Sequence, residues 1–77
     1  MDYRERIISD PTILMGKPVV KGTRISVELI LKRLSEGASV EDVLAVYPNL
    51  KKEDILAVLA YSADAIGNEA VIESSHR

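Results

Sequence analysis

The spacing of the hydrophobic residues changes near residue 26 and divides the chain into two parts. The first part holds two brief strand candidates, the β-branched pair at 7–8 and the stretch 18–21 with a β-branched pair at its centre, and turn-forming residues follow each. Such pairs predict two short strands, and Pro18 puts the second strand at a sheet edge or at its own start. We therefore expect a small β element with turns over residues 7–25.

Beyond residue 26 the apolar residues recur three and four positions apart, which is the period of an α-helix. Ser26 is a favourable N-cap and Gly37 is favourable just past a helix end, so a first helix is predicted over 27–36. Ser39, with Asp42 three positions later, forms an acidic variant of the capping box and predicts the start of a second helix.

A third helix is predicted over 52–66, between a tight connector that begins at Pro48 and a terminating Gly67. Its expected buried stripe consists of Ile55, Leu59 and Ile66, flanked by Leu56, Val58 and Ala63. Its expected outward face consists of Glu53, Asp54, Ala57, Ala60, Tyr61 and Asp64.

Together these elements predict a single, mainly α domain over residues 1–77. The short N-terminal β element (7–25) precedes a three-helix bundle (26–66), and a largely polar tail follows (67–77). The last two helices, joined by a tight turn, have the outline of a helix-turn-helix. Many functions use that outline, so it does not define one by itself.

The composition limits how such a domain is stabilised. The 77 residues include no Cys, Phe or Trp, and the single His is His76. A core of Ile, Leu, Val and Ala in so small a domain supplies roughly 3–5 kcal/mol, and small domains often need a staple or a partner. With no disulfide and no metal site expected, we predict a homodimer without cofactors.

Charge and hydropathy restrict the partners. The net charge is −2, whereas a dedicated nucleic-acid binder usually has a basic footprint. No apolar run approaches the roughly 20 residues that span a bilayer. The first ten residues are charged and lack the apolar core of a signal peptide. We expect a cytoplasmic protein that does not associate with a membrane.

The stretch MGKPVVKGTR, residues 15–24, combines the glycine, lysine and threonine of phosphate-binding loops. Their order differs from that of a P-loop, and Pro18 lacks a backbone N–H that an anion needs. We interpret the stretch as a structural motif of turns around a short strand, made by Gly16, Pro18, Gly22, Thr23 and Arg24. Arg24 is expected to reach a carboxylate or a carbonyl, with the acidic pairs at 41–42 and 53–54 as candidate partners.

These features occur in an order that resembles the domain-of-unknown-function 433 family. They are Asp10-Pro11, Gly16-Lys17-Pro18, Gly22-Thr23-Arg24, Gly37 before a polar helix cap, and Tyr47-Pro48-x-Leu50 ahead of a helix starting near Glu53-Asp54. The resemblance covers residues 7–61. It implies a homeodomain-like three-helix fold and the antitoxin half of a toxin–antitoxin pair, whose toxin is nuclease-like. One departure is Lys51, where the family usually has a capping Thr or Ser, and this leaves the helix start open by a residue or two.

DNA binding is one candidate function. A helix-turn-helix reads base edges with Arg, Asn, Gln or Ser on its second helix, whereas the expected outward face here is acidic and rich in alanine. The candidates for DNA phosphate contacts lie elsewhere and are Lys32, Arg33, Lys51 and Lys52. The alternative is that these are solvated charges balancing the twelve acidic residues.

A protein interface is the second candidate, because small residues and a tyrosine on a helix suit close packing. The candidate residues, facing a second copy or a toxin, are Ala57, Ala60 and Tyr61; alternatively the alanines are only good helix formers. No catalytic constellation is evident, since the carboxylate pairs fall in helix first turns. We predict a non-catalytic helix-turn-helix module, an antitoxin that binds a nuclease-like toxin with operator DNA as a further ligand. The alternative is a homodimeric protein-interaction module without DNA binding.

Overall fold

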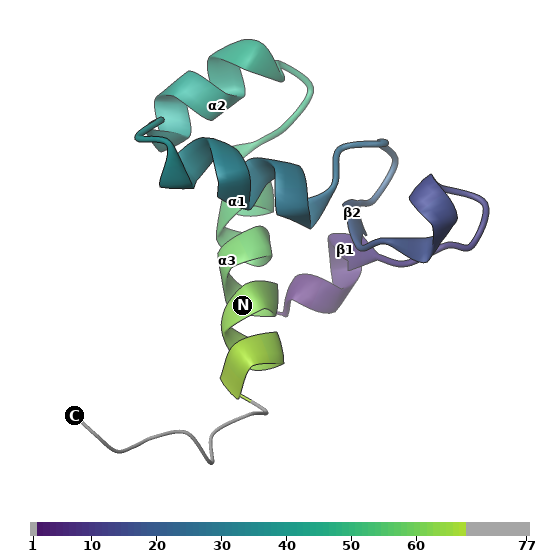
Figure 1. Cartoon of the computed structure of the whole chain (residues 1–77). Helices are drawn as coiled ribbons and strands as arrows, with labels where there is room; N and C mark the ends of the chain where they lie inside the picture. The colour runs from purple at the N-terminus through teal and green to yellow at the C-terminus, as the bar shows by residue number, and fades with distance from the viewer. Residues whose placement is uncertain (1, 68–77) are drawn as a thin grey trace.

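The structure, a computed structural model, describes residues 2–67. In chain order the elements are the 3-10 turn η1 (Tyr3–Glu5), β1 (Ile7–Ile8), the 3-10 turn η2 (Leu14–Gly16), β2 (Val19–Val20), α1 (Val27–Ser35), α2 (Val40–Val46) and α3 (Lys52–Gly67). The predicted mainly α fold, with three helices after a short β element, is confirmed. Figure 1 shows α3 as the central helix, with α1 crossing its N-terminal half and the β element on one side of it.

The β element is a minimal antiparallel sheet. Ile7 lies opposite Val20 and Ile8 opposite Val19, so the second strand is shorter than the sequence predicted. Ile7, Val19 and Val20 are all buried. The two strands therefore contribute apolar side chains to the hydrophobic core.

A hydrogen-bonded turn sends the chain from β2 into α1. The N–H of Thr23 donates to the carbonyl of Val20 at 3.0 Å, and Gly22 has the positive φ of +81° that this turn requires. The Thr23 hydroxyl donates to the same carbonyl at 2.8 Å and accepts from the N–H of Ile25 at 2.9 Å. This places Ser26, whose hydroxyl accepts from the N–H of Leu29 at 3.0 Å, as the predicted N-cap of α1.

The helix ends follow the capping residues of the sequence. Gly37, at φ +101°, closes α1 in a Schellman motif, because the N–H of Ala38 donates to the Arg33 carbonyl at 3.2 Å. The capping box of α2 is present in both directions: Ser39 Oγ accepts from the N–H of Asp42 at 3.0 Å, and Asp42 Oδ2 accepts from the N–H of Ser39 at 2.9 Å. α1 ends one residue earlier than predicted and α3 one residue later.

The buried face of α3 matches the predicted one only in part, since Ile55 and Val58 are buried as predicted but other positions are not. Ala57 is fully buried and Asp54 is 8% exposed, although both were expected to face outward. Leu59 and Ile66, expected in the core, are 42% and 70% exposed. The reason is that α3 has apolar residues on both sides, so periodicity alone does not select the inner one; β1 and η1 pack on α3 and make the choice.

The core itself lies where α1, α3 and the β element meet. Its buried side chains are those of Ile7, Val20, Val27, Ile30, Val43, Leu50, Ile55, Ala57 and Val58. Tyr3, on η1, packs its ring edge-on against that of Tyr61, with ring centres 5.6 Å apart. The N-terminal segment thus packs directly on α3, near the other end of the described chain.

Candidate protein-interaction surface

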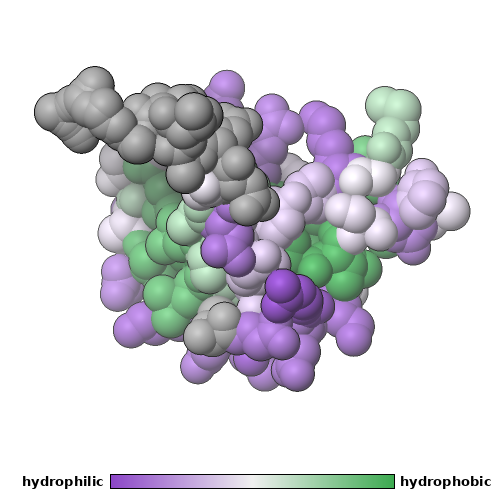
Figure 2. Space-filling model, turned by 90° about the horizontal axis from the view of Figure 1, so that it is seen from below, coloured by the Kyte–Doolittle hydropathy of each residue, from purple (hydrophilic) through white to green (hydrophobic). Residues whose placement is uncertain are grey.

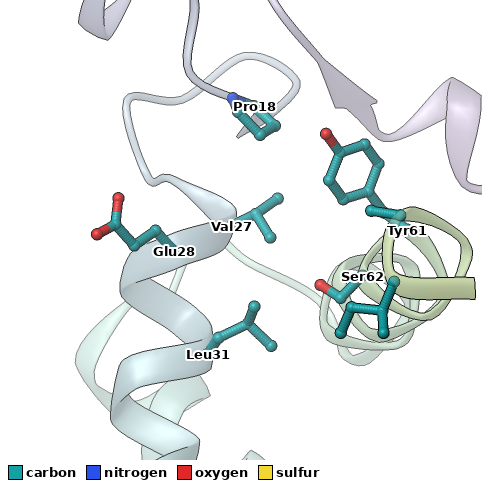
Figure 3. Close-up of a pocket in the computed structure, with 8 residues that line it drawn as sticks. Pro18, Val27, Glu28, Leu31, Tyr61 and Ser62 are labelled. Atoms are coloured by element: carbon teal, nitrogen blue, oxygen red, sulfur yellow. The ribbon is translucent and has the colours of Figure 1, made fainter. Parts of the chain in front are cut away.

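A groove separates α1 from the C-terminal half of α3. Its volume is about 400 Å³, and its lining residues are Pro18, Val27, Glu28, Leu31, Tyr61, Ser62, Ala65 and Ile66. Figure 3 shows Val27 and Leu31 pointing across the gap toward Tyr61 and Ser62, while Glu28 points away from it. We call this feature the α1–α3 groove.

The polar groups beside the α1–α3 groove are already engaged within the chain. The hydroxyl of Ser62 donates to the carbonyl of Val58 at 2.7 Å. The Nζ of Lys17 lies 3.0 Å from Oε1 of Glu28 in an exposed ion pair. What the groove offers to a ligand is therefore mostly apolar surface, together with the phenol of Tyr61.

A second apolar surface runs along the solvent side of α3. It consists of Leu56, Leu59, Ala63 and Ile66, and all four are exposed. Their spacings of three, four and three residues put them on one stripe of the helix. We call it the α3 seam; it meets the α1–α3 groove at Ile66. Figure 2, seen from below, shows hydrophobic residues at the surface among hydrophilic ones.

The predicted interface residues are only partly placed at the surface. Ala60 and Tyr61 are half-buried, but Ala57 belongs to the core, so its assignment to an interface was wrong. The sequence prediction missed the α3 seam because it assigned all four of its members to the buried side. The available signal was that α3 has more apolar positions than a single buried stripe accommodates, so some of them need a second partner.

The four candidate phosphate contacts are all exposed. Lys32 and Arg33 lie near the C-terminal end of α1, whereas Lys51 and Lys52 lie at the start of α3. Within residues 2–67, the single ion pair made by any of them joins Arg33 Nη1 to Glu36 Oε1 at 3.6 Å. These cations are thus accessible to an anionic partner.

Arg24 does not have the role that was predicted for it. Its side chain is exposed and forms no ion pair with any other residue of the described range 2–67. Asp54, one of its expected partners, instead pairs with Arg6 at 3.0 Å. In the rest of the predicted structural motif, Gly16 and Gly22 have positive φ and Thr23 forms the turn described above.

Hydrogen bonds within the fold account for the shifted pKa values. The N–H of Thr12 lowers the pKa of Asp10, and the N–H of Ser39 lowers the pKa of Asp42. Donation of its hydroxyl to Asp64 at 2.9 Å raises the pKa of Tyr3. None of these three groups lines the α1–α3 groove, so the shifts reflect a turn, a helix cap and a long-range contact on α3.

The described residues, 2–67, offer neither a metal site nor a membrane-spanning helix. These residues contain no cluster of three or more His, Cys, Asp or Glu side chains that could hold a metal ion. No helix among them is both long and apolar enough to cross a membrane.

The order of elements and the α2–α3 pair define a small helix-turn-helix domain with an N-terminal β hairpin. The model of the family described as "Protein of unknown function (DUF433)" matches residues 7–62, and the chain belongs to that family.

Two relatives agree with this assignment. The uncharacterized protein y4eO of Sinorhizobium fredii is 41% identical over 59 residues, which is 77% of this chain and 27% of that protein. The crystal structure of a DUF433 member from Anabaena variabilis matches with a TM-score of 0.74 at 28% identity, over 83% of this chain and 62% of that one. The chain therefore spans about a quarter of the length of the first relative and slightly less than two thirds of that of the second.

Proposed function

We propose that this chain is a non-catalytic, cytoplasmic helix-turn-helix module that acts as an antitoxin and binds a nuclease-like toxin in the α1–α3 groove. The observation that supports this function most is the apolar character of the groove, where Val27 and Leu31 face α3 across an open gap. Apolar surface of this kind, rimmed by polar residues, is typical of protein-binding sites. The ligand chemistry it fits is an apolar segment of the toxin.

The face of α3 that a helix-turn-helix turns toward bases supports a protein partner over sequence-specific DNA. It carries Leu56, Leu59 and Ala63, all exposed and without a hydrogen-bond donor. Reading a base edge requires donors or acceptors such as those of Arg, Asn or Gln. Leucine at the same positions contributes only hydrophobic contact. Such contact stabilises binding to an apolar protein surface but does not distinguish base pairs in a major groove.

The test is co-purification of the tagged chain with the product of the neighbouring gene, after co-expression. Ala65 is exposed on the groove wall, so Ala65→Glu places a charge in the groove while leaving the core intact. We expect it to reduce toxin retention at least about tenfold, which is 1.4 kcal/mol of binding free energy. Unchanged retention by this variant, or no retention by the unaltered chain, would refute the proposal.

A matched control is available at Met15. This side chain is 93% exposed and does not line the α1–α3 groove, and its φ of 57° is tolerated by Asp. The substitution Met15→Asp adds one negative charge, as Ala65→Glu does, and is expected to leave toxin retention unchanged.

Operator DNA is the second candidate ligand, because Lys32, Arg33, Lys51 and Lys52 are exposed at the ends of two helices. Contacts of this kind would bind phosphates without reading sequence. Retardation of the gene's own upstream DNA, repeated over a salt series, measures this. Neutralising about three phosphates gives a slope of log affinity against log salt near −2.7. No retardation at low salt would exclude DNA as a ligand.

A further inference from the structure

We propose that the α3 seam is a homodimer interface, in which two copies of α3 pack antiparallel about a two-fold axis that passes between Leu59 and Ala63. This deepens the proposed function, on which it rests, by assigning the surface through which the antitoxin pairs with a second copy of itself. The α3 seam and the α1–α3 groove occupy different sides of the same helix, so both can be filled at once except around Ile66.

The first argument is that α3 carries a second apolar stripe beside the one in the core. Ile55, Ala57 and Val58 face the core and are fully buried, whereas Leu56 and Leu59 face solvent. An apolar stripe on a surface helix normally packs against another element. Within the described residues 2–67, this second stripe stays exposed.

The second argument is that the flanks of α3 are already occupied. Tyr3 covers one flank, with its ring against Tyr61 and its hydroxyl 2.9 Å from Asp64. α1 crosses the other flank and forms the α1–α3 groove with it. The α3 seam between them faces outward, so it is the side to which a second copy has direct access.

The third argument is the self-complementarity of the spacing. Leu56, Leu59, Ala63 and Ile66 occupy alternating a and d positions of a heptad. They are also symmetric about Tyr61: in an antiparallel pair Leu56 meets Ile66 of the second copy. Leu59 then meets Ala63 of the second copy, so a large side chain packs on a small one. An isologous two-fold interface requires this kind of self-match.

A parallel pair fits the same residues less well. It sets Leu59 against Leu59 and Ala63 against Ala63, which crowds one layer and leaves a gap in the next. The antiparallel register avoids this mismatch.

The size of the interface sets its strength. Residues 56–66 span about 15 Å at 1.5 Å per residue. A single helix pair of that length buries less than the roughly 800 Å² per partner of a standard interface, so the dimer is weak and depends on concentration. This agrees with a small domain that gains stability from pairing.

The test is sedimentation equilibrium of the isolated chain over a range of about 1 µM to 1 mM. We expect the average mass to rise from monomer to dimer, and Ala63→Glu to shift the midpoint at least about tenfold to higher concentration. Ala63 is exposed, so the variant keeps its fold, which circular dichroism verifies. Met15→Asp is the charge-matched control. A monomer at every concentration, or dimerisation of Ala63→Glu like that of the unaltered chain, overturns the proposal.

The orientation is tested with cysteines, because the chain has none of its own. Leu59→Cys and Ala63→Cys are prepared separately, mixed and oxidised. The antiparallel pair predicts that the mixed disulfide between the two variants forms faster than either symmetric one. Preferential formation of symmetric disulfides overturns the antiparallel register.

The two proposals fail separately. Ala63 and Ala65 lie on opposite sides of α3, so Ala63→Glu interrupts pairing and Ala65→Glu interrupts the groove. Loss of toxin retention with an intact dimer affects the proposed function alone. Absence of a dimer with normal toxin retention refutes the α3 seam as an interface alone.

Discussion

Arg6 pairs with Asp54 across 48 positions of sequence, with Nη1 of the arginine 3.0 Å from Oδ1 of the carboxylate. The other oxygen, Oδ2, accepts from the N–H of Lys51 at 2.8 Å. One carboxylate therefore supplies half of a capping box to α3 and fixes the N-terminal segment to the same helix. Because Asp54 is nearly buried, the pair is shielded from solvent more than a surface ion pair is.

Replacing Asp54 by Ala is expected to lower the free energy of unfolding by about 2 kcal/mol, because it leaves the N–H of Lys51 and the guanidinium of Arg6 without their acceptor. Urea denaturation measures this. Glu53→Gln, at the exposed neighbouring position, is the control and should cost about 0.5 kcal/mol or less. Equal effects of the two variants would contradict the role assigned to Asp54.

The cap of α2 gives a second prediction. Ser39→Ala removes the acceptor for the N–H of Asp42 and is expected to cost about 1 kcal/mol of stability. Ser39→Gly should cost less, because glycine is itself tolerated at an N-cap. Thermal or urea unfolding of the three proteins gives the order. A Ser39→Ala variant as stable as the unaltered chain would show that the cap does not contribute.

Acid should destabilise the fold through its capping and turn carboxylates. The N–H of Ser39 holds the pKa of Asp42 below its usual value of 3.8, and the N–H of Thr12 does the same for the pKa of Asp10. A lowered pKa in the folded state stabilises it fully above the unfolded pKa, and this contribution disappears as the pH falls through the folded pKa. The free energy of unfolding should therefore decrease below about pH 4. Asp42→Asn, which cannot titrate, should flatten part of that decrease.

The burial of Ala57 gives a fourth prediction. Ala57→Gln forces a larger, polar side chain into a fully buried position and is expected to cost about 3 kcal/mol. Ala60→Gln, one position before Tyr61 and half-buried, should change stability by about 0.5 kcal/mol or less. Unfolding measured at low protein concentration separates folding from pairing. Similar stability of the two variants would contradict the burial of Ala57 in the core.

The helix and strand positions are mostly predictable from the sequence, because capping and helix-ending residues act on backbone groups close to them in the chain. Ser26, Gly37 and Ser39 satisfy or terminate backbone hydrogen bonds within a few residues of themselves. The strand at 7–8 and the start of α3 at Lys52 are found where they were predicted. The unusual Lys51 does not displace that start, because Asp54 bonds its N–H.

The inner face of α3 was not predictable in the same way. Ile55, Leu56, Val58 and Leu59 are all apolar, so two adjacent stripes are equally hydrophobic. The choice depends on contacts with Tyr3 and Ile7, which lie about fifty residues earlier and carry no local sign of where they dock. The predicted pairing of Arg24 with Asp54 was wrong for the same reason. Asp54 pairs with Arg6 instead, and the segment around Arg6 has no strong hydrophobic pattern that would predict where it docks.

The hydrogen bond between Tyr3 and Asp64 has a consequence for biosynthesis. These residues stand 61 positions apart, so the N-terminal segment leaves the ribosome long before the helix that receives it. Until α3 emerges, Ile7 and Val20 have no surface on which to bury their side chains, and the hairpin between them is too short to persist alone. The nascent chain therefore gains its tertiary structure only once α3 has emerged.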